Sequence, residues 1–453
     1  MQGRKSAIVF LLLLGALLAS GHDAARGMGV AMASDSSLGE SDRSAEPVAG
    51  PLCTSFCIDN GGYSLHGANL EHQSFYKGLL YVNRRGVSKE GLDPSTTGET
   101  ARWTSKYGSI TFNLVGYEFA WGGMNEAGLT LSTMSLRESR GPADDERPPL
   151  EESMYAQYLL DNCSTVGEVI ASDAAVRVLN PLSHFLVCDR TGECTTIEFL
   201  NSKTTYHTGD DLPIKALTNN TYRDAFKAWR KGKLSDQSLT RFAIAADRVR
   251  DYDPAGGESI IDYAFDTLYM ADGDRRGGPS AQWSLVFDTE NLRIDFRTKR
   301  NPQVRTIDFA KIDFSCQAPV LMLDIHALSG DISDRLESYS HERSVEQFVL
   351  FFDAWGMDIS RDRTEALLQR LEAFACASPD EQPAKPVPPD PGSTLAGGPV
   401  DPGPGKERSA VPWPWLLVAG AFIPFALAVW YVARPRSNQP RVGKHERRDG
   451  SNA

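Results

Sequence analysis

The sequence predicts an α+β protein in which antiparallel β-sheets are covered by helices. Short runs rich in apolar and β-branched residues are joined by compact turns containing Gly, Asn or Asp, which is typical of hairpins. Longer runs carry apolar residues three and four positions apart, as amphipathic helices do. Because the hairpins pair locally and the helices are grouped between them, the sheets are expected to be antiparallel.

The expected strands come in pairs that flank turns. The first pair, 54–58 and 63–70, flanks the turn "DNGG", and the run 283–297 folds back on itself at "TENL". The other expected strands are residues 78–83, 119–125, 128–134, 184–189 and 195–200. Five helices are expected from the apolar spacing, over residues 148–162, 221–232, 238–252, 258–271 and 363–375.

The chain of 453 residues is expected to begin with an export signal. Arg4 and Lys5 precede a short apolar run that ends in small residues, which predicts a signal peptide over residues 1–21. Residues 22–52 are rich in Ala, Gly, Ser, Asp and Glu without any period, and are interpreted as a disordered leader or propeptide. The folded domain is therefore expected over residues 53–377.

A membrane anchor is expected at the other end of the chain. Residues 378–410 are dense in Pro and Gly and predict a linker. Residues 411–433 are apolar over about one bilayer, with Trp and Tyr at both ends, and the basic residues 434–453 follow. A buried core helix over 415–432 is the alternative, which the flanking linker and basic tail disfavour. The sequence thus predicts a single-pass membrane protein with an exported domain, periplasmic or extracellular, and a cytoplasmic tail.

Charge and motif content narrow the range of partners. The net charge is −12 and the exported region carries no basic cluster, which argues against nucleic acid as a partner. The sequence contains no P-loop, dinucleotide fingerprint or metal-ligand spacing, and no metal or organic cofactor is expected. The oligomeric state is left open.

Seven cysteines leave at least one thiol without an intrachain partner. Cys188 and Cys194 bracket the turn "DRTGE" and can face each other across a hairpin. A bridge from Cys53 to Cys57 is not expected, because four strand residues advance about 13 Å and bridged Cα atoms lie about 4.4 to 6.8 Å apart. Cys53 is thus expected to stay reduced. Two more bridges are expected among the other cysteines, in a pairing that the sequence leaves open: Cys57, Cys163, Cys316 and Cys376.

Cys53 is positioned to become an N-terminal nucleophile. A thiol is a good nucleophile when a base lies beside it and positive charge stabilises its thiolate. Cleavage between Leu52 and Cys53 would free an α-amine, whose pKa is about 7.7 to 8.0 in model peptides, to act as that base. The residue would then carry nucleophile and base together, and the leader would mask the amine until it is removed.

Seven segments carry a resemblance to a known family. In order they are "CTSF", "GANLEH", "GMNEAGL", "HFLVCDRTGECTTIEF", "ALTNNTY", "SLTRFA" and "QWSLVFDTENLRIDFRT". With them, residues 53–325 resemble the choloylglycine hydrolase family of linear amide C–N hydrolases, which contains bile salt hydrolases and penicillin V acylases. The resemblance implies a four-layer αββα N-terminal-nucleophile hydrolase fold.

The resemblance also implies roles for five residues. Cys53 matches the catalytic nucleophile, and Glu71 falls where the family usually has an Asp that orients the cysteine's amine and thiol. The backbone N–H of Ser135 and the side-chain amide of Asn219 are implied to form the oxyanion hole. Arg241 matches an arginine held near the sulfur.

Each of these assignments has a structural alternative. Glu71 could be a solvated charge at a strand end, and Arg241 a surface charge on an amphipathic helix. Asn219 and Asn220 could be ordinary turn residues, and either could be the functional one. Asn125, in "MNEAG", is interpreted as part of a hairpin turn.

The resemblance implies hydrolysis of a small-molecule N-acyl amide through a cysteine thioester. Ala68 stands where bile salt hydrolases have Arg, so one of two expected cations is missing and the substrate is less defined than the reaction. Two other functions remain open. An acyltransferase would pass the thioester to an amine, and an inactive membrane-tethered binding module is favoured by Ala68 and Glu71.

Overall fold

The computed structural model describes residues 52–59, 64–72, 77–92, 100–273, 280–354 and 357–378. The expected signal peptide, membrane helix and cytoplasmic tail lie outside these residues, as do the leader up to Pro51 and the linker from residue 379. Within the described part of the chain, no helix is both long and apolar enough to cross a membrane. All five predicted site residues lie in the described part.

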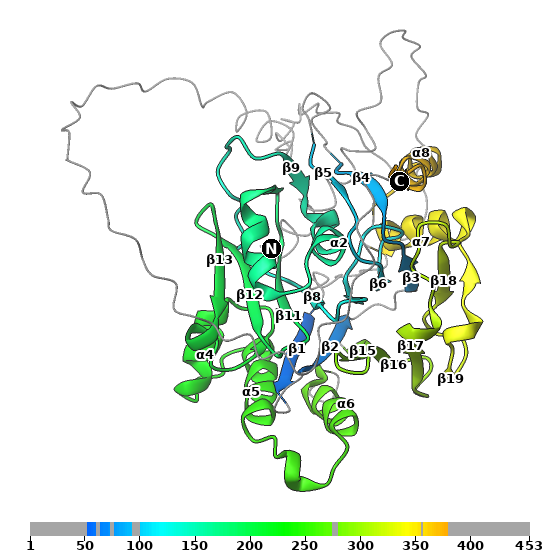
Figure 1. Cartoon of the computed structure of the whole chain (residues 1–453). Helices are drawn as coiled ribbons and strands as arrows, with labels where there is room; N and C mark the ends of the chain where they lie inside the picture. The colour runs from blue at the N-terminus through cyan, green and yellow to red at the C-terminus, as the bar shows by residue number, and fades with distance from the viewer. Residues whose placement is uncertain are drawn as a thin grey trace, which may run out of the picture. The chain divides into compact units, whose positions relative to one another are not determined.

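Two β-sheets form the centre of the fold (Figure 1). The first sheet has seven strands in the order β14-β1-β2-β15-β16-β17-β19 and is antiparallel except for the pair β17 and β19. Its strands are β1 (Leu52–Asp59), β2 (Ser64–His72), β14 (Ala216–Leu217), β15 (Ser280–Asp288), β16 (Arg293–Thr298), β17 (Arg305–Asp308) and β19 (Gly330–Asp331).

The second sheet has nine strands in the order β13-β12-β11-β8-β7-β6-β3-β18-β20, and all of its pairs are antiparallel. Its strands are β3 (Leu79–Asn83), β6 (Ser109–Asn113), β7 (Gly122–Asn125), β8 (Thr130–Ser135), β11 (Ser183–Cys188), β12 (Cys194–Leu200), β13 (Lys203–Thr208), β18 (Leu321–Asp324) and β20 (Glu337–Ser338). Two small sheets contain β9 (Pro149–Glu151) with β10 (Arg177–Leu179), and β4 (Val87–Glu90) with β5 (Arg102–Thr104) and β21 (Ala375–Cys376).

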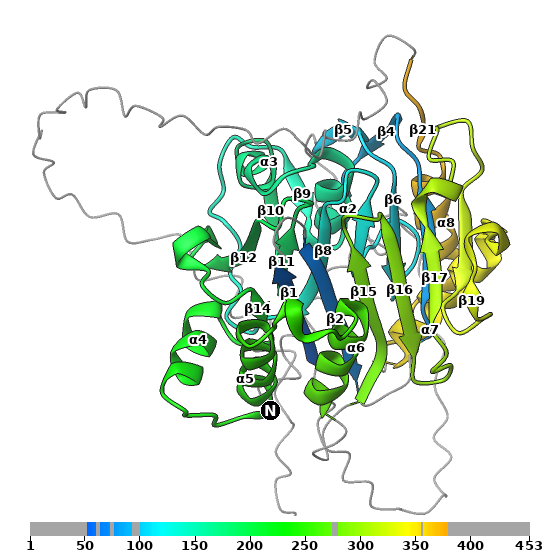
Figure 2. The same cartoon turned by 60° about the horizontal axis from the view of Figure 1, so that its bottom comes forward.

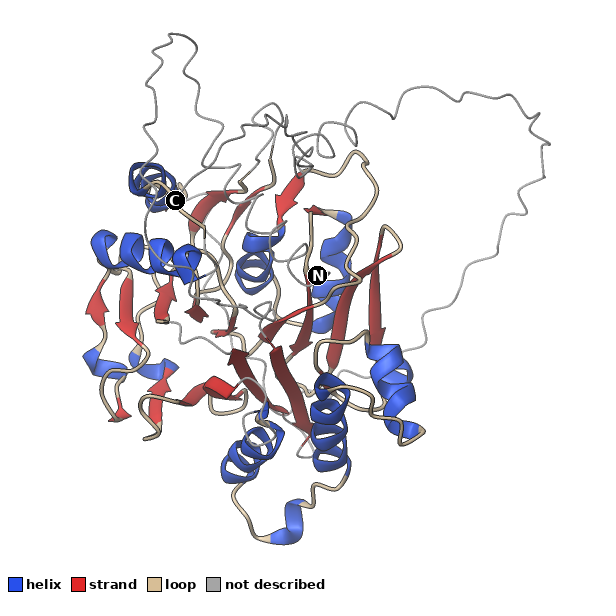
Figure 3. Ribbon diagram, turned by 180° about the vertical axis from the view of Figure 1, so that it is seen from behind, coloured by secondary structure: helices blue, strands red, loops and turns tan. Residues whose placement is uncertain are grey.

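Helices cover both outer faces of the paired sheets (Figures 2 and 3). They are α2 (Glu152–Asn162), α3 (Val166–Ala171), α4 (Tyr222–Arg230), α5 (Gln237–Arg250), α6 (Ile260–Ala271), α7 (His341–Ala354) and α8 (Arg361–Glu372). α5 packs on β1 and α6 on β2 and β15, whereas α2 packs on β7 and β8 of the other sheet. Because β1 also contacts β8 and β11, the layers follow the order helix, sheet, sheet, helix. The predicted α+β class with antiparallel sheets is confirmed.

Strand β1 turns its alternate residues to two different layers. Ser55 Oγ lies 2.7 Å from Ser132 Oγ on β8, so the odd-numbered residues face the second sheet. Thr54 Oγ1 accepts a hydrogen bond from Arg241 on α5, so the even-numbered residues face the helices. Opposite Phe56, Gly67 of β2 has no space for a Cβ, which would lie 2.5 Å from the phenyl ring. This packing fixes β1 against β2.

Several predicted element boundaries were wrong, among them those of the strand expected over 119–125, which begins at Gly122, and of the helix expected over 363–375, which is Arg361–Glu372. The helix expected over 148–162 begins at Glu152, because residues 149–151 form β9. Pro148 and Pro149 favour extended backbone before a helix and explain the late start. β1 begins at Leu52, two residues before the expected strand 54–58, so the last residue of the expected leader is already in the sheet.

The cysteine pairing agrees with the prediction in part. Cys188 is bonded to Cys194 across the hairpin, and Cys53 is free. Of the remaining cysteines, Cys316 pairs with Cys376, whereas Cys163 is a free buried thiol rather than a bridge partner. The sulfur of Cys188 also contacts that of a further cysteine, Cys57 on β1.

Candidate active site

The predicted nucleophile lies at the second position of β1. Cys53 is opposite Leu70 of β2, and its side chain is 1% exposed. The preceding residue, Leu52, is opposite Glu71, so the peptide bond expected to be cleaved lies at the end of the ladder between β1 and β2. The sheet therefore brings Cys53 and Glu71 close together, although 18 positions separate them in the chain.

Arg241 joins the main chain at Cys53 to the carboxylate of Glu71. Its Nη1 lies 3.0 Å from Glu71 Oε2 and donates to the Cys53 carbonyl oxygen and to Thr54 Oγ1. Thr54 Oγ1 in turn donates to Glu71 Oε1 over 2.8 Å. Arg241 reaches this position because its face of α5 is buried, and Asp236 caps that helix by accepting from the Leu239 N–H.

Asn219 contacts both Cys53 and Arg241. Its Oδ1 accepts from the Cys53 backbone N–H over 2.9 Å and from Arg241 Nη2 over 2.8 Å. Its Nδ2 donates to the Ser135 carbonyl oxygen over 3.0 Å. Of the two neighbouring asparagines, Asn219 is therefore the one that the fold brings to Cys53. Ser135, the last residue of β8, reaches the cluster through this carbonyl contact.

Burial decides between the alternatives that the sequence left open. Glu71 is fully buried and Arg241 is 1% exposed, so the interpretations as solvated surface charges are wrong. Asn125 accepts from the backbone N–H groups of Ala127 and Leu129, which confirms its expected role in the hairpin turn. Ala68 is fully buried on β2, on the same face as His66 and so toward the second sheet, and it contributes no charge there.

No family model matches the chain. It is 25% identical over 259 residues to a penicillin V acylase of Pectobacterium atrosepticum, an alignment that covers 47% of this chain and 69% of that protein. Its fold is similar to the structure of penicillin V acylase from Agrobacterium tumefaciens, with a TM-score of 0.54 and 24% identity, covering 64% of this chain and 98% of the other. A variant of conjugated bile acid hydrolase from Clostridium perfringens gives a TM-score of 0.50 and 18% identity, with 61% and 98% covered. The chain is thus similar in sequence to a penicillin V acylase and similar in fold to the structures of a penicillin V acylase and a conjugated bile acid hydrolase.

Burial sets the protonation of the site around Cys53. Burial and the negative charge of Glu71 raise the pKa of the Cys53 thiol to about 12, although Arg241 and a hydrogen bond from Trp121 lower it. Burial likewise raises the pKa of Glu71 to about 7, against the opposing charge of Arg241 and the Thr54 hydrogen bond. While Leu52 remains attached, the thiol is therefore protonated at neutral pH.

We expect this protonation to make Cys53 inert in the uncleaved chain. At pH 8, iodoacetamide should label Cys53 about 10³-fold more slowly than an ordinary thiol, because the thiolate fraction falls about tenfold per pKa unit. Mass spectrometry of tryptic peptides from the chain that still carries its leader measures the rate. A free-thiol peptide in the same tube is the control, and labelling of Cys53 at the rate of that peptide would contradict the prediction.

Several residues that the sequence did not single out hold Asn219 in place. Its backbone N–H donates to Ser238 Oγ over 2.8 Å. The preceding carbonyl, of Thr218, lies 2.5 Å from His184 Nε2, and His184 Nδ1 lies 3.2 Å from Glu198 Oε1. Burial raises the pKa of Glu198, but hydrogen bonds from His184 and His207 outweigh it and lower the pKa to about 2.

The register of the hairpin between β11 and β12 could have revealed the pair formed by His184 and Glu198. β11 and β12 pair Cys188 with Cys194 and Phe185 with Ile197, so one further step along the ladder places His184 opposite Glu198. Two ionisable residues opposite each other in otherwise apolar strands predict a buried ion pair. Trp121 donates a hydrogen bond to the Cys53 sulfur. The sequence pattern assigned Trp121 only to a strand, and nothing in it indicated this contact.

Atoms suited to metal binding lie away from Cys53. Among the described residues, the group of His, Cys and acidic side chains close enough to hold an ion consists of Cys57, His66 and Cys188, whose ligand atoms lie within 4.8 Å of one another. The site around Cys53 instead offers a thiol, a carboxylate, an amide and a guanidinium. These groups suit nucleophilic chemistry at a carbonyl carbon.

Proposed function

We propose that this protein hydrolyses the C–N bond of linear amides in small N-acyl compounds, with Cys53 as an N-terminal nucleophile. The similarity to a penicillin V acylase supports an amide hydrolase. The observation that carries the proposal is the convergence of Arg241 and Asn219 on the Cys53 main chain, with the Glu71 carboxylate held by Arg241. The cluster is buried apart from Asn219, which is partly exposed.

The reaction begins after the bond between Leu52 and Cys53 is cut. The new α-amine takes the thiol proton, and the sulfur attacks the amide carbonyl carbon. The resulting oxyanion accepts hydrogen bonds from Asn219 Nδ2 and the Ser135 N–H. The leaving amine takes the proton from the α-ammonium, and water then attacks the thioester to release the acid and restore the thiol. In the uncleaved chain Asn219 Nδ2 donates to Ser135 O, a bond it exchanges for the oxyanion.

Arg241 has two tasks in this mechanism. Its guanidinium faces the Cys53 carbonyl and the Asn219 Oδ1, so it fixes the main chain of the nucleophile and turns the Asn219 amide nitrogen toward Ser135. Its charge also lowers the pKa of the thiol. Because Ala68 supplies no cation, Arg241 is the charge on which thiolate formation depends in this mechanism.

The test is hydrolysis of penicillin V and of a conjugated bile acid by the purified chain, with both products quantified. Release of the free amine and the free acid in equal amounts supports the proposal. Transfer of the acyl group to an added amine would instead identify the acyltransferase function. Binding without turnover would identify the inactive binding module.

The Asn219→Ala substitution is expected to lower kcat about 10² to 10³-fold, which is the usual loss when one oxyanion donor is removed. The chain should still fold, because the Asn219 side chain is partly exposed. The matched control is Asn220→Ala, one position further along the same turn. An equal loss of kcat in both variants would contradict the assignment of Asn219.

We also propose that the domain is exported and anchored through residues 411–433, with residues 434–453 in the cytoplasm. The apolar run, its aromatic ends and the basic tail support this topology. Protease added to intact cells should digest the domain or the linker and leave a short fragment that contains the tail. An antibody to the C-terminal residues detects this fragment by its size. Protection of the whole chain would contradict the proposal.

A further inference from the structure

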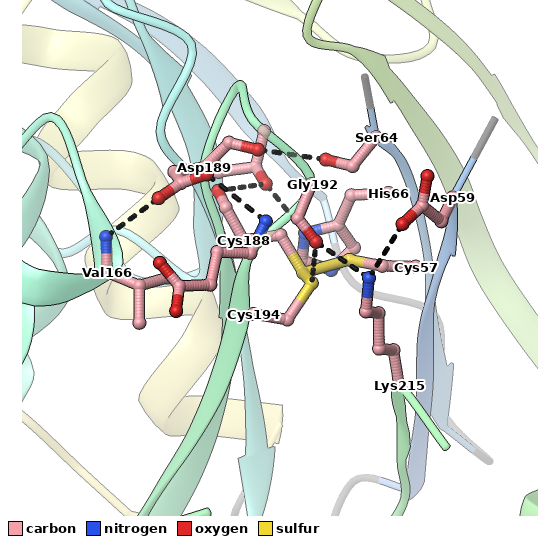
Figure 4. Close-up of a disulfide and its surroundings, with 12 residues drawn as sticks. Cys57, Asp59, Ser64, His66, Val166, Cys188, Asp189, Gly192, Cys194 and Lys215 are labelled. Carbon is pink, nitrogen blue, oxygen red and sulfur yellow. Dashed lines mark hydrogen bonds and ion pairs between the residues drawn. A yellow bond between two sulfur atoms is a disulfide. The ribbon is translucent and has the colours of Figure 1, made fainter. Parts of the chain in front are cut away.

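A cluster of three cysteines lies between the two sheets, apart from the candidate active site (Figure 4). Cys57 belongs to β1, and Cys188 and Cys194 face each other at the turn between β11 and β12. The sulfur of Cys188 is in bonding contact with both of the others. Cys57 and Cys188 are fully buried, and Cys194 is 2% exposed.

The two bonds at Cys188 are alternatives, because a disulfide sulfur forms one S–S bond. Cys316 and Cys376 pair with each other elsewhere, and Cys53 and Cys163 are free. In either alternative one of the three clustered cysteines is left as a thiol. That thiol is Cys194 when Cys57 bonds to Cys188, and Cys57 when Cys188 bonds to Cys194.

Both bonds need an adjustment of the backbone, and the bond between Cys57 and Cys188 needs the strands to move closer together, because its Cα separation exceeds 7 Å. The Cα atoms are 7.2 Å apart for Cys57 and Cys188, and 4.1 Å apart for Cys188 and Cys194. Common disulfides have Cα separations of about 4.4 to 6.8 Å, so the two pairs lie slightly outside this range on opposite sides. The first bond joins the two sheets, whereas the second closes only a hairpin.

The surroundings give the two possible thiols different access to solvent. Cys194 lines a pocket of about 370 Å³, together with Gly192 and Lys215. The Cys194 sulfur lies 3.8 Å from the Gly192 carbonyl oxygen, and Lys215 Nζ donates to the same oxygen over 2.7 Å. This ammonium also pairs with Asp59, and it shares the Gly192 carbonyl oxygen as a neighbour with the Cys194 sulfur.

Lys215 also lies beside Cys57, whose backbone N–H donates to the Lys215 carbonyl oxygen over 2.8 Å. His66 lies next to Cys57 and Cys188, but its Nε2 and Nδ1 contact Ser55 and Thr130. The pocket, which Cys194 lines and Cys57 does not, therefore distinguishes Cys194 as the reactive member of the cluster.

We propose that Cys57, Cys188 and Cys194 form a thiol–disulfide exchange site that reacts with small disulfides through the pocket at Cys194. Internally, the Cys194 thiolate attacks the Cys188 sulfur, the new bond between them forms, and the bond to Cys57 breaks with release of its thiolate. The reverse attack restores the first state. A small disulfide R–S–S–R that enters the pocket is attacked by the Cys194 thiolate, which gives a mixed disulfide on Cys194 and releases one RS⁻. This site does not depend on the proposed amidase function.

The first experiment maps the bonds in the full chain. Acid quenching, alkylation and digestion without reduction should yield both linked peptides, Cys57 with Cys188 and Cys188 with Cys194. Cys194→Ser should retain only the first and Cys57→Ser only the second. The first variant should have the larger folded-to-unfolded ratio, by about 100-fold, because its bond spans 131 residues rather than 6.

The second experiment uses 2-hydroxyethyl disulfide as the probe. The wild-type chain and Cys194→Ser are mapped again after treatment, and the mixed disulfide is expected on Cys194 in the wild type and on neither Cys57 nor Cys188 in the variant. Lys215→Met should slow the modification about two- to fivefold, the effect of one partly exposed charge. Cys57→Ser, in which Cys194 is held by Cys188, should be modified more slowly than the wild type.

Three outcomes would overturn the proposal. One is a single linkage under every quench condition, and another is a mixed disulfide confined to Cys53 or Cys163. The third is one zinc ion per chain in the purified protein with all three clustered thiols unpaired, since Cys57, His66 and Cys188 have spacing suited to a metal. Elemental analysis of the same sample measures the zinc.

Discussion

Cys53→Ala is expected to abolish amide hydrolysis, with a loss in kcat on the order of 10⁶, the size seen when a hydrolase loses its nucleophile. The substitution removes one sulfur atom from a site in which Arg241, Asn219 and Glu71 keep their mutual contacts. If removal of the leader is autocatalytic, the leader should also persist in this variant. Cys53→Ser should process but turn over poorly, because a hydroxyl is far less acidic than a thiol.

N-terminal sequencing of the purified, active protein is the decisive measurement, and Cys53 is expected as its first residue. Cys163→Ala is the matched control, since it removes another free buried thiol and should leave activity and processing unchanged. An active enzyme that begins upstream of Cys53 would falsify the mechanism, because no α-amine would then be present to take the thiol proton.

Arg241→Ala is expected to lower the free energy of unfolding by about 3 to 5 kcal/mol, because it leaves the buried carboxylate of Glu71 without its partner. Activity should be lost as well, since the Cys53 carbonyl and the Asn219 amide lose a shared donor. Arg241→Lys should recover part of the stability and little of the activity, because one ammonium cannot replace two separate guanidinium nitrogens.

The stability loss in Arg241→Ala should grow with pH. Burial raises the pKa of Glu71 to about 7 even with Arg241 in place. The stability due to a raised carboxyl pKa is fully present below the unfolded value, about 4.5, and is lost as the pH rises through the folded value. Without the opposing charge the Glu71 pKa rises further, so the deficit should be larger at pH 8 than at pH 5.

Urea unfolding of the wild type and of Arg241→Ala at pH 5 and at pH 8 measures how the stability loss depends on pH. Arg250→Ala, on the same helix, is the control, because Arg250 is about half exposed and its ion pairs should contribute little. A deficit of the same size at both pH values would contradict the account of Glu71. Adding Glu71→Gln to Arg241→Ala should restore part of the stability.

Local features of the chain explain which elements the sequence could predict. Hairpins such as β1 with β2, and β15 with β16, are specified by their own turns and apolar runs, and both were predicted. α7 was not predicted, although Val345, Phe348 and Phe352 recur at helical spacing and are buried. β18 pairs with β3, more than 200 positions earlier in the chain, and nothing local in its four residues marks that partner.

The candidate site likewise contains residues that the sequence indicated and residues that only the fold reveals. Resemblance brought forward Cys53, Glu71, Ser135, Asn219 and Arg241, and the fold brings all five into one set of contacts. Their roles in catalysis remain predictions. Thr54 and Trp121 act on Cys53 and Glu71 through contacts that exist only after the sheets pair and α5 docks. The third member of the cysteine cluster was out of reach for the same reason, because 131 positions separate Cys57 from Cys188.

The hydrogen bond from the Cys53 nitrogen to Asn219 has a consequence for how such a protein is switched on. That nitrogen is still part of a peptide bond, yet it already lies 2.9 Å from Asn219 Oδ1, the oxygen to which the free α-amine would also donate a hydrogen bond. Hydrolysis of the Leu52–Cys53 bond therefore changes the chemistry of one atom without requiring it to move. Under the proposed mechanism the uncleaved chain is blocked by a covalent cap rather than by a misfolded site. Activation should then proceed without a slow refolding phase, and a chain translated from Cys53 onward should assemble the same cluster.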